Sequence, residues 1–285
     1  MTAGRTTDTS RRSPGEVPDP IIHEQPPTRL EQLLGHHRAT FLVLLILIPL
    51  VCWSWIVVMA RDMYGPMIGA SAWMMTLRWD ARHVVLLWAM WAVMMAGMML
   101  PSASPLLLLY GAAARRSGGG AAAGASLRIY ALAAGYVAVW ALFSVAATMA
   151  QRILSMMLIV SPMMTLTSRV ASAAVLALAG IYQLTPVKRA CLHACQSPLS
   201  FMMHRWRAGS IGAFRMGVDH GIHCVGCCWA LMLLLFVGGV MNLTVILAIT
   251  LFVAIEKLLP FGATAARIGG VALISIAAWM LLLTP

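Results

Sequence analysis

Seven long runs of apolar residues divide the chain, and the residues outside these runs include most of the Arg, Lys, Pro and Gly residues. Each run is near the roughly 17–25 residues that a helix needs to cross the hydrocarbon layer of a bilayer. Prolines follow several runs, at Pro101, Pro105, Pro186 and Pro260, and we expect them to end helices. The pattern predicts an all-α, polytopic transmembrane bundle of about seven spans (six to eight). The predicted spans are 41–60, 84–100, 128–150, 170–186, 218–239, 243–259 and 268–283.

Composition supports a membrane protein. Hydrophobic residues make up 61% of the chain and charged residues only 10%, which excludes an ordinary soluble domain. Of the nine acidic residues, only Asp219 and Glu256 follow residue 80, as expected if later segments lie in lipid, where charges are costly. We assign the net charge of +11 to basic loops that face anionic lipid, and we expect no nucleic-acid partner.

Residues 1–40 differ from the rest. They are rich in Thr, Pro, Arg and acids without an apolar period, which is typical of a disordered or surface-lying tail. The first apolar run begins at Phe41, too deep for a signal peptide, so residues 41–285 form the transmembrane domain. With a cytoplasmic N-terminus, fifteen of the twenty Lys and Arg residues fall on the inner side. This bias predicts that orientation in a bacterial inner membrane, with 187–216 inside.

In that orientation, five of the six cysteines lie at the cytoplasmic face, where thiols stay reduced. Clustered cysteines in that compartment indicate metal binding or redox chemistry more often than structural disulfides. Cys52 stands alone in the first apolar run and is expected to be a small buried residue.

The densest group of metal-binding residue types lies at 220–228. On a helix, steps of 100° per residue place its members within one arc of about 140°. Thiolate and imidazole are donors for soft and borderline metals. Asp219, beside this group, is a candidate for orienting a ligand imidazole. The candidate ligands here are His220, His223, Cys224, Cys227 and Cys228.

A second group, Cys191, His193 and Cys195, follows the fourth span. The fourth and fifth spans are expected to be antiparallel neighbours, which would bring both groups together. Four thiolates in a tetrahedron suit zinc, and two or three suit Cu(I). The alternative is that these residues merely fill contacts between helices.

Two further features are open to two interpretations. Met90, Met94 and Met98 form a stripe on the second span, which is either a thioether path for Cu(I) or ordinary core packing. Glu256 is either a ligand or proton acceptor inside the bundle, or an interfacial charge beside a snorkelling Lys257.

Three motifs stand out along the chain. They are Trp91-x2-Met94…Met98-Met99-Leu-Pro101-Ser-x2-Pro105, Tyr182-Gln183-x-Thr-Pro186-x-Lys188-x2-Cys191-x3-Cys195, and Gly221-x-His223-Cys224-x-Gly226-Cys227-Cys228-Trp229-x-Leu-Met232. Together they resemble a bacterial family described as predicted metal-binding integral membrane proteins. The similarity covers roughly residues 85–260 and implies a polytopic metal-binding protein of the inner membrane.

The sequence therefore predicts a membrane protein that binds a thiophilic metal, copper favoured and zinc next, for transport, delivery or sensing. Its partners would be the lipid bilayer and a metal-donor or metal-acceptor protein or membrane complex. One alternative is a membrane thiol or cofactor-dependent oxidoreductase that uses the Cys-x2-Cys pair. Another is a non-enzymatic subunit of a membrane complex with a structural zinc site.

Overall fold

The described part of the chain is entirely helical. The computed structural model describes residues 29–65, 80–116, 122–157, 159, 161 and 165–282, and gives them nine helices and no strand. The first helix begins at Arg29, within the predicted tail, and residues 1–28 lie outside the described residues. The helices are α1 (Arg29–Met63), α3 (Ala81–Arg116), α4 (Ala122–Met156), α5 (Arg169–Leu184), α6 (Pro186–Gln196), α7 (Pro198–Arg205), α8 (Gly209–Gly238), α9 (Leu243–Leu258) and α10 (Gly262–Leu282).

Each of the seven predicted spans coincides with a helix, which confirms the all-helical fold, although the fourth, fifth and sixth spans were drawn one or two residues past the ends of α5, α8 and α9. Five helices are long and apolar enough to cross a membrane, namely α1, α3, α4, α8 and α10. A sixth span results if α5 and α6, which meet at an angle of 66°, are counted together. The predicted sixth span forms α9, whose 16 residues are fewer than the roughly 20 that a perpendicular span needs.

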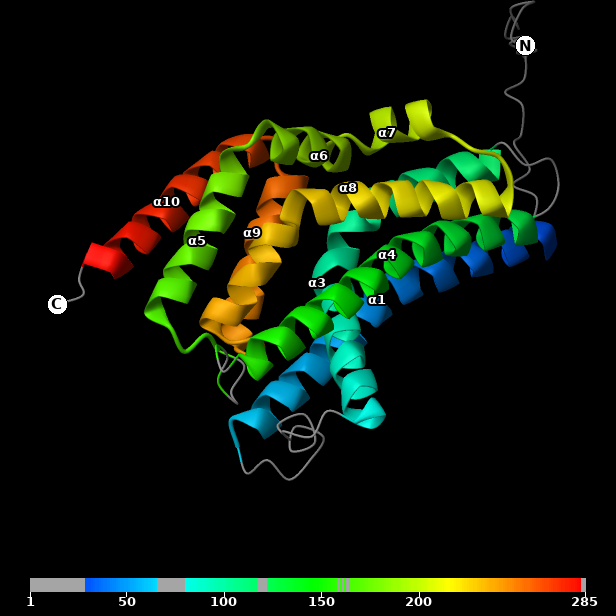
Figure 1. Cartoon of the computed structure of the whole chain (residues 1–285). Coiled ribbons are helices and arrows are strands. Elements are labelled where there is room, and N and C mark those ends of the chain that lie inside the picture. Colours follow the sequence, from blue (N-terminus) through cyan, green and yellow to red (C-terminus); the bar gives the residue numbers. More distant parts are fainter. Residues whose placement is uncertain are drawn as a thin grey trace, which may run out of the picture.

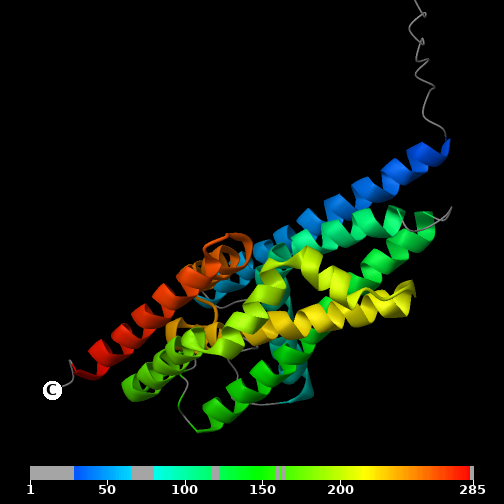
Figure 2. The same ribbon diagram turned by 90° about the horizontal axis from the view of Figure 1, so that it is seen from above.

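Helix α8 occupies the middle of the bundle (Figure 1). It packs along α4 and also contacts α5, α6 and α9, while α3 packs against α4 and α1. Helices α5 and α10 lie side by side at the C-terminal end of the molecule, as the view from above also makes clear (Figure 2). Side chains that α8 turns inward are therefore within reach of several other helices.

Small residues let α4 and α8 approach closely. A Cβ added at Gly135 would collide with the carbonyl oxygen of Phe214, and one added at Gly217 would collide with that of Leu132. Such backbone contact is a common way for helices to associate in membranes, where lipid is as apolar as the side chains. The approach brings Tyr136 of α4 against the next turns of α8.

Pro101 and Pro105 do not end the second span, so this prediction was wrong. Both lie inside α3. Proline removes the hydrogen bond to the carbonyl four residues earlier, but other groups supply donors here. The indole Nε1 of Trp53 donates to the oxygen of Gly97 at 3.2 Å, and the hydroxyl of Ser104 donates to the oxygen of Pro101 at 2.7 Å. With both carbonyls bonded, the helix continues through the membrane region.

Pro186, in contrast, does mark a boundary. Thr185 ends α5 and also caps α6: its hydroxyl donates to the Tyr182 oxygen at 2.7 Å and accepts from the Lys188 amide at 3.2 Å. Pro186 occupies the first turn of α6, where its missing N–H costs nothing. The bend turns α6 across the middle of α8, near Gly226 and Cys227, so the second cysteine group approaches the first. Pro260 likewise follows the end of α9.

Candidate metal centre

Helix α8 turns its three cysteines into the bundle. Cys224, Cys227 and Cys228 are all at most 1% exposed. The thiols of Cys227 and Cys228 donate to the carbonyl oxygen of Cys224 at 3.1 and 2.9 Å, respectively. The helical spacing therefore collects these sulfurs on one buried face, as the i, i+3 and i, i+4 relations require.

Cys195 of α6 joins them from the second group. Its Sγ lies 4.0 Å from the Sγ of Cys227, and the residue is partly exposed. We refer to Cys195, Cys224, Cys227 and Cys228 as the thiol cluster. All four are free thiols in the structure.

Lys257 of α9 reaches the thiol cluster, which no pattern in the sequence predicted. Its Nζ donates to the Sγ of Cys224 at 2.8 Å and lies 3.9 Å from the Sγ of Cys228. The side chain is only 4% exposed, so the expectation that Lys257 snorkels to the membrane surface was wrong. The sulfurs offer the ammonium a buried partner, and this removes the need to reach water.

Helices α3 and α4 complete the surroundings of the cluster. The Sδ of Met99 lies 3.9 Å from the Sγ of Cys228 and 3.9 Å from the Nζ of Lys257. The hydroxyl of Tyr136 donates to the Met99 oxygen at 3.1 Å and lies 3.0 Å from the Sγ of Cys224. A thioether, a phenol and an ammonium thus surround the thiols. No pattern in the sequence pointed to Tyr136, whereas Met99 directly follows Met98, the last methionine of the predicted stripe.

Cys191 lies near this cluster but is placed by a different contact. A Cβ at Gly226 would lie 2.9 Å from the Sγ of Cys191, so only glycine lets this sulfur pack on α8. The hydroxyl of Tyr182 donates to the oxygen of Gly226, and the rings of Tyr182 and Trp229 lie 5.0 Å apart. These contacts dock α5, through Tyr182, and α6, through Cys191, on α8, and thereby hold Cys195 beside Cys227.

The predicted histidine ligands have three different environments. His193 is exposed on α6. His223 bonds through Nδ1 to the backbone oxygen of Asp219 at 2.7 Å. His220 is buried, with its ring 5.7 Å from that of Tyr136 and 5.1 Å from that of Phe201. Its Nδ1 has no hydrogen-bond partner among the described residues, although buried polar atoms are rarely left unpaired. His220 is therefore the histidine best suited to add a ligand to the cluster.

Asp219 forms ion pairs rather than orienting His220. One carboxylate oxygen lies 3.6 Å from both Arg205 and Arg207. All three side chains are partly exposed, so the pairs contribute little stability. The carboxylate links the segment after α7 to α8 at the end of the bundle.

Glu256 is also engaged away from the thiols. Its carboxylate accepts from the Nζ of Lys188 at 2.7 Å and from the Nε2 of Gln183 at 2.7 Å. Both members of the ion pair are fully buried. In addition, Gln196 donates to the backbone oxygen of Glu256 at 2.6 Å. Glu256 therefore pins both sides of the α5–α6 bend to α9, and neighbouring Lys257 points to the other side.

The predicted methionine stripe lies inside the bundle. Met90, Met94 and Met98 are at most 2% exposed and belong to the main hydrophobic core. This burial is what core packing requires. The thioether path stays a prediction, and the methionine that touches the cluster is Met99.

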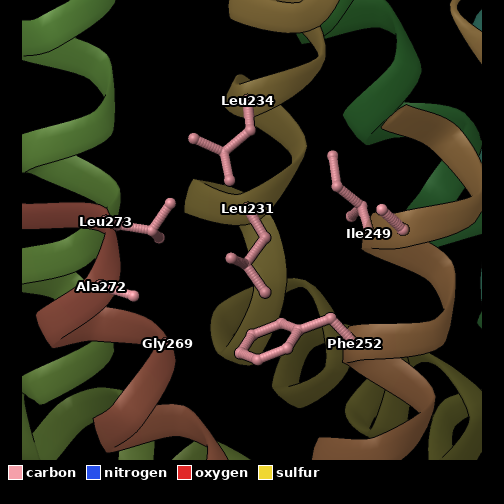
Figure 3. A pocket seen from close by; sticks show the side chains of 8 residues that line it. Leu231, Leu234, Ile249, Phe252, Gly269, Ala272 and Leu273 are labelled. Carbon is pink, nitrogen blue, oxygen red and sulfur yellow. The ribbon is translucent and has the colours of Figure 1, made fainter. Parts of the chain in front are cut away.

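An apolar hollow lies away from the thiol cluster. A cavity of about 300 Å³ between α8, α9 and α10 is lined by eight apolar residues, with Leu231, Phe252 and Leu273 facing one another across it (Figure 3). It offers no side-chain donor to a metal ion. The chemistry of the described part of the chain is therefore concentrated at the thiol cluster.

The number and type of donor atoms limit which metal ion the cluster can bind. Among the described residues, no group of three or more His, Cys, Asp or Glu side chains is arranged to hold a metal ion. The sulfur contacts come in pairs instead: the thiols of Cys195 and Cys227 lie 4.0 Å apart, and the thioether of Met99 lies 3.9 Å from the thiol of Cys228. Two or three soft sulfur donors suit Cu(I), whereas structural zinc is nearly always four-coordinate.

Comparison with known proteins agrees with this chemistry. Residues 88–280 match PpoB2, a family described as a copper chaperone. No curated protein and no solved structure matches the chain. The matched segment covers more than half of the 285 residues and contains every residue of the thiol cluster, together with Met99, Tyr136 and Lys257. The chain therefore belongs to the PpoB2 copper chaperone family.

Proposed function

We propose that this protein carries Cu(I) in a bacterial inner membrane and passes it to a partner protein or membrane complex. Cu(I) would be held by Cys227 and Cys195, whose sulfurs lie 4.0 Å apart. The sulfur of Cys224 accepts from Lys257, and Met99 and Cys228 lie beside this lysine as further soft sulfur atoms. In this proposal, copper is the cargo and the thiol cluster is its binding site.

One observation carries this proposal: the sulfurs of Cys195 on α6 and Cys227 on α8 approach to 4.0 Å, and a cationic group, the ammonium of Lys257, lies 2.8 Å from another sulfur of the same cluster, that of Cys224. A buried cation beside several sulfurs is stable only if those sulfurs carry compensating negative charge or strong dipoles. A site that accommodates an ammonium ion is suited to a monovalent metal ion. Membership of a copper chaperone family supports the same assignment.

The position of Cys195 supports a transfer step. Cys195 is the partly exposed member of the cluster, whereas the three cysteines of α8 are buried. Cu(I) tolerates two or three ligands, so it can pass between thiolates by gaining one before it loses another. We propose that copper moves between Cys195 on α6 and Cys227 on α8, with α6 facing the partner.

Replacing the buried ligands tests this function. The double variant Cys224→Ser/Cys227→Ser should retain less than about a tenth of the copper held by the wild-type chain, because a hydroxyl is a poor ligand for a soft ion. The matched control is Cys52→Ser, which removes a buried thiol of α1 and leaves the cluster intact. Elemental analysis of detergent-purified protein, loaded under reducing conditions, measures the metal. Equal copper in the double variant and the control would refute the proposed site.

Thiol redox chemistry is the second candidate, and the contact between Cys195 and Cys227 favours this pair over the Cys224–Cys227 motif. Titration of free thiols distinguishes the two functions. A copper site frees its thiols on addition of a chelator, whereas a disulfide frees them only on reduction.

A further inference from the structure

The position of Lys257 has a consequence for metal selectivity. The Nζ of Lys257 lies 2.8 Å from one cluster sulfur, that of Cys224, and 3.9 Å from another, that of Cys228. It also lies 3.9 Å from the Met99 sulfur and 3.5 Å from the Ser102 hydroxyl. A positive charge is therefore built into the wall of the thiol cluster.

No carboxylate shares this charge among the described residues. The partners given above for Lys257 are three sulfurs and one hydroxyl. The adjacent Glu256 faces away, toward Lys188 and Gln183. Adjacent residues on a helix point about 100° apart, so this division follows from the backbone. The thiols are then the groups that balance Lys257.

We propose that Lys257 determines specificity at the thiol cluster, by favouring a monovalent soft cation such as Cu(I) over a divalent cation such as Zn²⁺. This inference rests on the proposed function, because it concerns the same site. Lys257 would act through its charge and need not coordinate the metal.

The charge of Lys257 disfavours a divalent ion. Two thiolates and one ammonium leave a net charge of −1, which one Cu(I) neutralises, whereas Zn²⁺ would leave a net positive charge in a buried site. Whatever the number of thiolates, the ammonium repels a divalent ion twice as strongly as a monovalent ion at the same distance. For a metal ion about 4 Å from the ammonium, this extra repulsion lowers the affinity for a divalent ion relative to a monovalent one. The factor is about fivefold in bulk water and about a thousandfold at an effective dielectric constant near 20.

The hydrogen bond from Lys257 to Cys224 also disfavours zinc. The ammonium occupies the Sγ of Cys224 as an acceptor and so competes for one donor of the cluster. Zinc requires about four ligands, whereas Cu(I) accepts two or three. A lysine at this position therefore disfavours zinc by both charge and coordination number.

The test compares Lys257→Met, which removes the charge, with Lys257→Arg, which keeps it. Cu(I) and Zn²⁺ affinities are measured on the detergent-purified full chain by competition with chromophoric chelators, under reducing conditions. The ratio of Zn²⁺ to Cu(I) affinity should be at least about tenfold higher in Lys257→Met than in Lys257→Arg. A merely structural role for Lys257 would lower both affinities and leave this ratio unchanged.

A second pair of variants covers the case in which Lys257→Met does not fold. Ser102→Asp would place a carboxylate beside the ammonium, and Ser102→Asn is its neutral counterpart of equal size. The affinity ratio should be at least about fivefold higher for Asp than for Asn. Equal ratios within each pair, in a protein that binds Cu(I), would overturn the selectivity role alone. A wild-type chain that binds no Cu(I) would overturn the proposed function and this inference together.

Discussion

The buried ion pair between Lys188 and Glu256 is expected to hold the bent α5–α6 segment in place. We consider Lys188→Met, which keeps the length and apolar stem of the side chain and removes its ammonium. Both members of the pair are 0% exposed and lie 2.7 Å apart. The substitution therefore leaves the carboxylate of Glu256 buried with Gln183 as its remaining side-chain partner.

The expected loss follows from this geometry. Removing one partner of a buried pair typically costs about 3–5 kcal/mol, because the other charge stays buried without compensation. Because the hydrogen bond from Gln183 is retained, we expect Lys188→Met to lose about 3 kcal/mol in its free energy of unfolding, near the lower limit of this range. This value corresponds to a change of roughly 150-fold in the unfolding equilibrium. Replacing both charges, in Lys188→Met/Glu256→Gln, should restore stability to within about 1.5 kcal/mol of the wild type.

Reversible unfolding by SDS in mixed micelles, followed by circular dichroism, measures these differences. If the single and double variants lose equal stability, the charge is not the cause and the reasoning is refuted. A loss below about 1 kcal/mol in Lys188→Met would also contradict it, because that is the range of an exposed pair. In either case, the ion pair could not be what fixes α6 against α9.

Two further predictions concern α6. Gly226→Ala introduces a Cβ 2.9 Å from the Sγ of Cys191. Such overpacking typically costs about 1–3 kcal/mol of stability. Because α6 must move to relieve the clash, we expect about tenfold weaker Cu(I) binding in chelator competition. Adding Cys191→Ala should recover most of the affinity, and a double variant as weak as Gly226→Ala would exclude the clash as the cause. Separately, a membrane-impermeant maleimide should label Cys195 before the cysteines of α8, because only Cys195 among the cluster is partly exposed. Peptide mass spectrometry gives the order, and earlier labelling of Cys224 would rule out access through α6.

Local sequence patterns were sufficient to locate the central part of each apolar helix and the cysteine-bearing face, but not the ends of the helices. The apolar runs gave the positions of the helices because each helix must cover its own backbone polar groups in lipid. The spacing of Cys224, Cys227 and Cys228 gave one face because helical periodicity is local. Neither prediction required knowledge of which helices are neighbours.

The prolines of α3 illustrate what a local pattern cannot provide. Pro101 lies inside the helix because Trp53, 48 positions earlier in the chain, donates to the freed carbonyl of Gly97. That compensation depends on how α1 packs against α3. A rule based on proline alone therefore ends the helix too early.

The partners of the thiols depended on tertiary structure in the same way. Tyr136 reaches Cys224 because Gly135 and Gly217 let α4 and α8 touch. Lys257 follows Glu256 in the chain, and only the packing of α9 decides which of the two charges meets the thiols. The sequence did indicate that Glu256 and Lys257 each need a partner, because two adjacent opposite charges on a buried helix point in different directions. It did not show which residues those partners are.

The central claim is that sulfur atoms of the thiol cluster hold Cu(I). X-ray absorption spectroscopy at the copper edge of the copper-loaded, detergent-purified chain tests this most directly. We predict monovalent copper bound by two or three sulfur atoms, a signal that Cys224→Ser/Cys227→Ser abolishes. A shell dominated by nitrogen or oxygen, or an unchanged sulfur shell in that double variant, would contradict the account.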